Sequence, residues 1–186
     1  MQRYMVHLQN RSHTSKDATA LLYRARELVG PEITVRDARV SKKYLVFDIS
    51  MPDSTDINAV AGKLKAITPL ASYEHVAERH MGKNEAIERA VELFNDEKYW
   101  SAHEVLESVW KGSNGAEKSI LNGIILVAAA FVHDEKDEPE ICLSILQRAR
   151  KKLDGADGEY HRIDIDRIAD LISKIINSGS IERFTI

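Results

Sequence analysis

One apolar run constrains the fold of this chain more than any other feature. Residues Ile120 to Val132 are apolar throughout, apart from Asn122 and Gly123. The run is shorter than the ~18–20 residues that cross a bilayer, so we expect a central helix that is buried on all sides. Because 44% of the 186 residues are hydrophobic, the chain has enough apolar side chains to surround such a helix.

A second segment, Tyr99 to Trp110, is expected to form a helical hairpin with this run. At about 100° of rotation per residue, its apolar positions fall on one side of a helix. His103 and Glu107 are four residues apart and are therefore neighbours on the helix surface. The edge of the apolar stripe carries a band of polar and aromatic side chains: Trp100, His103, Glu104 and Glu107.

The His103–Glu107 pair has two interpretations. An imidazole and a carboxylate one turn apart can chelate one divalent metal ion or share a proton. Glu104 is then the candidate catalytic base, and His133 is a third metal ligand if the second arm packs antiparallel in the right register. In the alternative interpretation Glu107 only orients His103, and His133 lies in a last helical turn, where the helix dipole favours a cation.

The hairpin resembles Domain of Unknown Function family 309 over about residues 83–155. The family pattern pairs a Phe-Asn…Tyr…Ala-His-Glu…Leu-Glu…Trp segment with an amide-Gly-hydrophobic segment that ends in His. This sequence departs from the pattern at Asn122, where we expect Gln. The resemblance implies a small helical bundle and brings no established activity. The matching positions beyond the His-Glu motif are further candidate site residues: Tyr99, Trp100, Trp110 and Asn122.

The first 78 residues alternate between strand and helix patterns. Period-two alternation and turn residues predict strands at 2–9, 32–40, 44–51 and 71–76, and helices at 14–29 and 55–66. The order β-α-β-β-α-β is ferredoxin-like, with an antiparallel sheet that has both helices on one face. We therefore predict a ferredoxin-like domain over residues 1–78.

The rest of the chain is predicted to be all helical. Residues 78–84 lack periodicity and contain Gly82, so they form the predicted boundary, and His80 within them is assigned no role. We predict a bundle of about five helices over residues 83–186, followed by a tail at 181–186 that lies along the surface or pairs with a strand. The predicted fold class is α+β, with a ferredoxin-like domain followed by a helical bundle.

Composition limits the function classes. The formal net charge of −3 argues against a dedicated nucleic-acid binder. The single cysteine, Cys142, cannot form an internal disulfide, and no cysteine cluster can hold zinc. Because the first residues show no signal-peptide pattern and nothing spans a membrane, a cytoplasmic protein is expected.

Three functions remain open at this point. The first in rank is a structural or interaction module with a protein partner or a second copy, because no motif supplies an activity. The second is a metal-dependent hydrolase that uses one divalent ion held by His103, Glu107 and His133. The third is an RNA-associated protein that uses a basic cluster in the first domain, formed by Arg36, Arg39, Lys42 and Lys43.

Overall fold

The computed structural model describes residues 1–77 and 81–186. The chain divides into two compact units, of which the first comprises Met1–Arg79 with Glu135–Asp137 and the second comprises His80–Asp134 with Glu138–Ile186. Part of the predicted boundary at 78–84 lies outside the described residues, as does His80.

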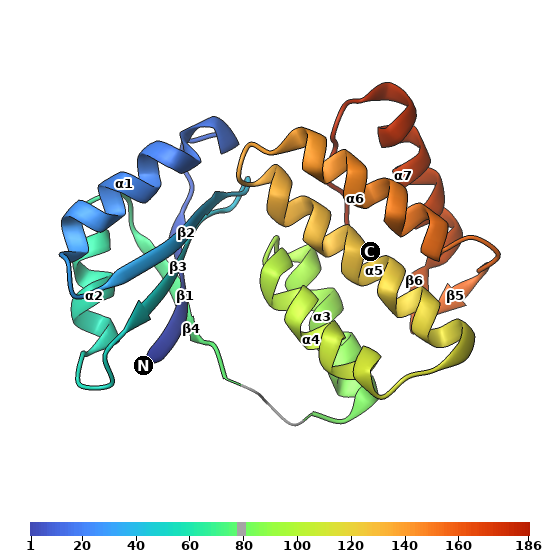
Figure 1. The fold of residues 1–186 in the computed structure, drawn as a ribbon, viewed down its shortest axis with the longest axis horizontal. Coiled ribbons are helices and arrows are strands. Elements are labelled where there is room, and N and C mark those ends of the chain that lie inside the picture. Colours follow the sequence, from blue (N-terminus) through green and yellow to red (C-terminus); the bar gives the residue numbers. More distant parts are fainter. Residues whose placement is uncertain (78–80) are drawn as a thin grey trace. The chain divides into compact units, whose positions relative to one another are not determined.

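The first unit is a four-stranded antiparallel sheet with two helices. The strands are β1 (Gln2–Gln9), β2 (Thr34–Val40), β3 (Tyr44–Met51) and β4 (Leu70–His75), and their order is β2-β3-β1-β4. The helices are α1 (Ala18–Val29), preceded by a 3₁₀ turn at Ser15–Asp17, and α2 (Ile57–Leu64). Figure 1 shows both helices on one side of the sheet. This is the ferredoxin-like arrangement that the sequence predicts.

The two helices of this unit begin later than predicted. Thr14 forms a capping box with Asp17, and it caps the short 3₁₀ turn before α1. The Asp56 carboxylate accepts a hydrogen bond from the Asn58 backbone N–H at 2.9 Å, so α2 begins at Ile57.

The second unit is helical. It contains α3 (Lys83–Asn95), α4 (Tyr99–Lys111), α5 (Gly115–Asp134), α6 (Pro139–Lys152) and α7 (Ile165–Ser178). The prediction of a helical bundle is confirmed. Helix α5 begins at Gly115 rather than at Ile120. Its first turns are polar and partly exposed, so the apolar run does not include them.

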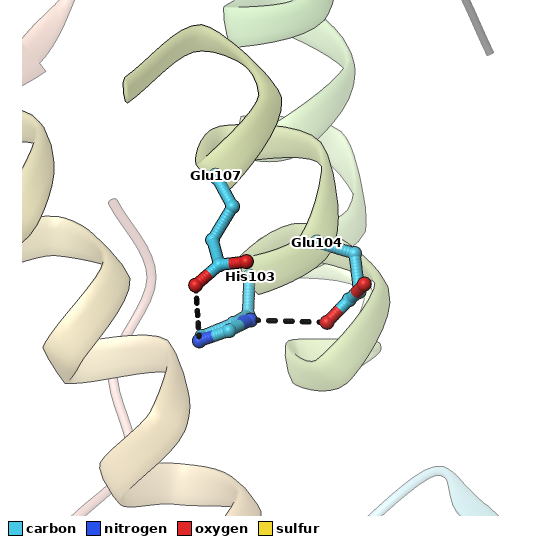
Figure 2. Close-up of side chains that lie close together, drawn as sticks. All are labelled: His103, Glu104 and Glu107. Carbon is cyan, nitrogen blue, oxygen red and sulfur yellow. Dashed lines mark ion pairs between the residues drawn. The ribbon is translucent and has the colours of Figure 1, made fainter. Parts of the chain in front are cut away.

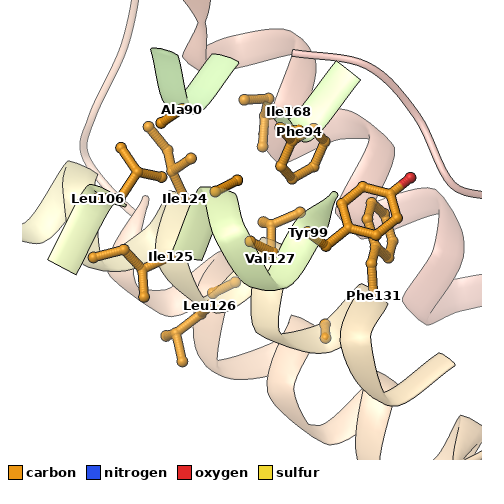
Figure 3. Close-up of a cluster of buried hydrophobic side chains, with 14 of the residues drawn as sticks. Ala90, Phe94, Tyr99, Leu106, Ile124, Ile125, Leu126, Val127, Phe131 and Ile168 are labelled. Atoms are coloured by element: carbon orange, nitrogen blue, oxygen red, sulfur yellow. The ribbon is translucent and has the colours of Figure 1, made fainter. Parts of the chain in front are cut away.

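Helix α5 supplies the centre of the core. Its buried residues run from Leu121 to Phe131 and face both α4 and α6, which pack against it. Figure 3 shows side chains of α5 meeting those of the α3–α4 hairpin. By length and composition α5 could span a membrane, but the core helix of a soluble protein passes the same test. Its burial among α4 and α6 identifies it as the core helix of a soluble globular protein.

A short hairpin between α6 and α7 was not expected. Strands β5 (Glu159–Tyr160) and β6 (Ile163–Asp164) pair through a two-residue turn in which His161 has φ 49° and Arg162 has φ 66°. Two consecutive positive φ values define the mirror-image turn that usually contains Asn-Gly. Because His-Arg does not resemble that signal, the local sequence does not predict the hairpin.

Gly123 lets the residue that follows α6, Leu153, approach α5. A Cβ atom at Gly123 would overlap Leu153 Cδ2 and would lie 2.6 Å from Leu153 Cγ. Leu153 is itself buried, so it has little room to move away.

We predict that Gly123→Ala destabilises the second unit by about 1–3 kcal/mol, because the new methyl group overlaps Leu153. Both tryptophans of the chain lie in α4, so denaturant unfolding followed by tryptophan fluorescence reports this unit. Gly62→Ala in α2 is the matched control, because nothing lies within 4 Å of its Cβ position. An unchanged midpoint for Gly123→Ala would contradict the close packing.

Candidate functional site

The polar band of helix α4 lies at the edge of the core because the apolar stripe of the same helix is buried in it. Tyr99, Ala102, Leu106 and Val109 are buried in the core of the second unit. This leaves His103 half-buried at the edge of the stripe. The band that the sequence predicts is therefore present.

Three side chains of this band converge. One ligand atom from each of His103, Glu104 and Glu107 lies within 4.8 Å of the others. The Nε2 atom of His103 is 3.9 Å from Glu107 Oε1, and its Nδ1 atom is 3.4 Å from Glu104 Oε1 (Figure 2). The two carboxylates thus flank the two nitrogens of one imidazole ring.

The Nδ1 side of the imidazole is the more enclosed. Among the described residues, the Nδ1 atom of His103 is buried and has no hydrogen-bond partner, although Glu104 lies at ion-pair distance. By contrast, the Glu104 and Glu107 side chains are 46% and 41% exposed, so solvent can reach the carboxylates. An oriented imidazole with one shielded nitrogen and one nitrogen beside a solvated carboxylate can accept a cation or a proton at Nε2.

Trp110 and Lys118 extend this face. Trp110 lies seven residues after His103 on the same side of α4, and its indole Nε1 is a buried donor without an acceptor in the part of the chain that the structure describes. The Lys118 ammonium, from the first turns of α5, lies 4.5 Å from the centroid of the Trp110 ring. This cation–π contact fixes a positive charge beside the C-terminal end of α4. Sequence reasoning missed Lys118, because the contact depends on how the two helices pack.

Asn122 lies one turn beyond Lys118 on α5. It is half-buried, and within residues 1–77 and 81–186 its amide has no hydrogen bond. Asn122 is a candidate from the family pattern, and the structure places it on α5. Its shorter side chain reaches less far than the glutamine that the family pattern has at this position.

The structure does not bring His133 to the cluster on α4. Its Nδ1 atom pairs instead with the Glu138 carboxylate, where α5 turns into α6. The reason is the hairpin geometry. The short loop after α4 places His103 level with about Gly123, and His133 is ten residues further along α5, about 15 Å away along the axis.

The remaining aromatic candidates differ in burial. Tyr99 is 2% exposed, and its ring packs against those of Phe94 and Phe131 with centroids 5.0 Å and 5.1 Å away. Tyr99 is therefore a core residue. Trp100 is half-buried on the band beside His103.

The basic cluster of the first unit is partly neutralised. Arg36 lies 3.9 Å from Asp48, and Arg39 lies 3.5 Å from Asp37. Asp48 also forms an ion pair with Arg3 at 2.6 Å, in the middle of the sheet face opposite the helices. Two arginines of the basic cluster are therefore engaged by carboxylates of the sheet unit.

Cys142 is a core residue rather than a nucleophile. It is fully buried in α6. Burial, together with the negative charge of Asp134, raises the pKa of the Cys142 thiol to about 12. Because the thiolate is the reactive form, this thiol is inert at neutral pH.

Residues 87–145 match the sequence model of a family described as a domain of unknown function (DUF309). This confirms the resemblance of the helical hairpin over those residues. Among solved structures, a conserved hypothetical protein from Thermus thermophilus is 28% identical, with a TM-score of 0.43 over 48% of this chain and 94% of that chain. No curated protein gives a significant match.

We predict that Cys142 reacts with a thiol reagent such as Ellman's reagent at least about a hundredfold more slowly in the native protein at pH 8 than in denaturant. Burial and the raised pKa both withhold the thiolate. The matched control is a Cys142→Ala, Ser54→Cys variant, whose exposed thiol should react at once. Rapid reaction of Cys142 in the folded protein would show that α6 opens locally.

Proposed function

We propose that the second unit binds one divalent transition-metal ion on α4, with His103 Nε2 and Glu107 as its ligands. The observation that carries this proposal is the 3.9 Å separation of His103 Nε2 from Glu107 Oε1. Two ligands at metal bond lengths of ~2.1 Å in tetrahedral geometry lie about 3.4 Å apart. A small side-chain rotation therefore suffices to bring both atoms onto one ion.

Glu104 has a supporting role in this proposal. Metal-binding histidines commonly direct their second ring nitrogen at a carboxylate, which fixes the ring and makes it a better ligand. Glu104 lies 3.4 Å from Nδ1 and is placed for that task. This arrangement favours a positioning role for Glu104 over the role of catalytic base.

The donor set indicates which metal fits. One imidazole and one carboxylate suit Zn²⁺, Mn²⁺ or Fe²⁺ better than Ca²⁺ or Mg²⁺, which prefer oxygen ligands alone. Two protein ligands leave positions open for water or for a small molecule, as in catalytic rather than structural sites. A metal-dependent hydrolase is the enzyme class that such an open position would serve.

An interaction module without metal is the second candidate. It is favoured by the exposure of the cluster, because carboxylates that are 41% and 46% exposed are well solvated without an ion. In this case His103 and Glu107 are a surface pair at the edge of the core. For either candidate we propose a cytoplasmic location, since the one cysteine is a buried free thiol, as suits a reducing compartment.

We predict that the purified chain binds about one Zn²⁺ in calorimetric titration, and that His103→Ala abolishes this binding. Glu104→Gln should keep the stoichiometry and weaken the affinity by about 10–100-fold, which is the usual effect of losing a partner of a metal-binding histidine. His133→Ala and His161→Ala are the matched controls, and both should bind normally. Elemental analysis after gel filtration checks the stoichiometry.

The same series separates the two candidates. If zinc, manganese and iron all fail to bind the unaltered chain, the metal proposal is wrong and the interaction module is favoured. If His133→Ala abolishes binding as fully as His103→Ala, the ligand set proposed here is wrong.

A further inference from the structure

The last residues of the chain bind to the helical unit as an extended peptide. Beyond α7, Gly179 adopts a left-handed conformation with φ 69°, and residues 180–186 have no regular secondary structure. We call residues 181–186 the tail. Hydrogen bonds and an ion pair join the tail to Asn95, Asp134 and Arg167 of the helical unit.

An aromatic contact anchors the centre of the tail. The Phe184 ring lies 5.2 Å from the Phe131 ring and 6.4 Å from the Phe94 ring, measured between centroids. Phe94 and Phe131 are both fully buried in the complete chain. Figure 3 shows these two residues beside Tyr99 in the core. The α3–α4 turn and the end of α5 therefore offer an aromatic surface that Phe184 covers.

The backbone of the tail is held in a manner that does not depend on its side chains. The Asn95 amide donates to the Ile186 carbonyl at 2.9 Å and accepts from the Ile186 N–H at 2.8 Å. The Arg167 guanidinium donates to the Thr185 carbonyl at 2.8 Å. A side-chain amide that pairs with both backbone groups of one residue acts as a neighbouring strand would.

An ion pair adds selectivity at the other end. Arg183 Nε donates to Asp134 Oδ2 at 2.6 Å, with the two side chains only 13% and 20% exposed. Charged pairs that are this enclosed depend strongly on the correct partner. The surface thus recognises a basic residue, then an aromatic residue, then two residues held through their backbone.

We propose that this surface is a peptide-recognition site, and that the tail of a second copy of the chain can occupy it in exchange for the chain's own tail. The tail is the ligand whose contacts with this surface the structure shows. The tail of a second copy has the same sequence and can make the same contacts. Gly179 and Ser180 join the tail to α7, and neither residue belongs to a helix or a strand. Exchange of an identical element between two copies is a low-cost route to a dimer.

The first test uses a labelled peptide of residues 179–186 and the full chain carrying Phe184→Ala. This variant weakens the chain's own tail, so the peptide should bind it saturably in fluorescence anisotropy. The unaltered chain should bind at least about tenfold more weakly, because its tethered tail competes at high effective concentration. A peptide with Phe184→Ala is the matched control and should not bind, and adding Asn95→Ala to the chain should reduce binding.

Folding must be checked in the same experiment. Phe184→Ala is compared with the unaltered chain by cooperative unfolding of the tryptophan signal. If it does not fold, Arg183→Gln replaces it, because this variant removes the ion pair with Asp134 and leaves the Phe184 ring in place. If neither folded variant binds the peptide, or if the control peptide binds equally well, the tail is a fixed part of the core and the proposal is wrong.

The second test identifies the occupant. Analytical ultracentrifugation of the unaltered chain over a wide concentration range should show a dimer fraction that Phe184→Ala removes and that Tyr23→Ala, at an exposed position in α1, retains. If the peptide binds but the chain is a monomer at every concentration, the exchange between copies is wrong, and the site instead takes a segment of another protein.

Discussion

The burial of α5 on all sides between Leu121 and Phe131 is the constraint on which the helical unit depends. An apolar helix without a polar face must be surrounded, and α4 and α6 both turn their apolar stripes toward it. Because Gly123 has no side chain, Leu153 can pack closely against α5. Because α4 uses Tyr99, Ala102, Leu106 and Val109 for this packing, its polar band is left at the edge of the core. The position of His103 and Glu107 is thus a consequence of how α5 is covered.

The features that the sequence predicted correctly are those with a local cause. The ferredoxin-like order follows from alternating patterns, and the neighbouring positions of His103 and Glu107 follow from helical spacing. The place of His133 could not be predicted, because it depends on the loop between α4 and α5 and on the helix register. The approach of Lys118 to Trp110 and that of Glu104 to Nδ1 depend on tertiary packing and on side-chain rotamers.

The position of the tail could not be predicted from the sequence either. Phe184 and Arg183 lie in a segment with no periodic pattern, so nothing in its local sequence indicates where it binds. The surface that the tail covers explains its position, because the aromatic rings beside the turn between α3 and α4 must be shielded from solvent. The Asn95 side chain donates one hydrogen bond to the Ile186 backbone and accepts one from it, and these bonds hold the end of the tail at that surface.

The two units also differ in how far apart in the sequence their contacting elements lie. In the helical unit the most extensive packing joins neighbours in the sequence, α3 with α4, α4 with α5 and α5 with α6, and the tail adds contacts over a longer separation. In the sheet unit, Val6 must find both Phe47 and Tyr73, which are far along the chain. Because nonlocal contacts slow folding, the unit that the ribosome synthesises last is expected to refold first from the denatured state.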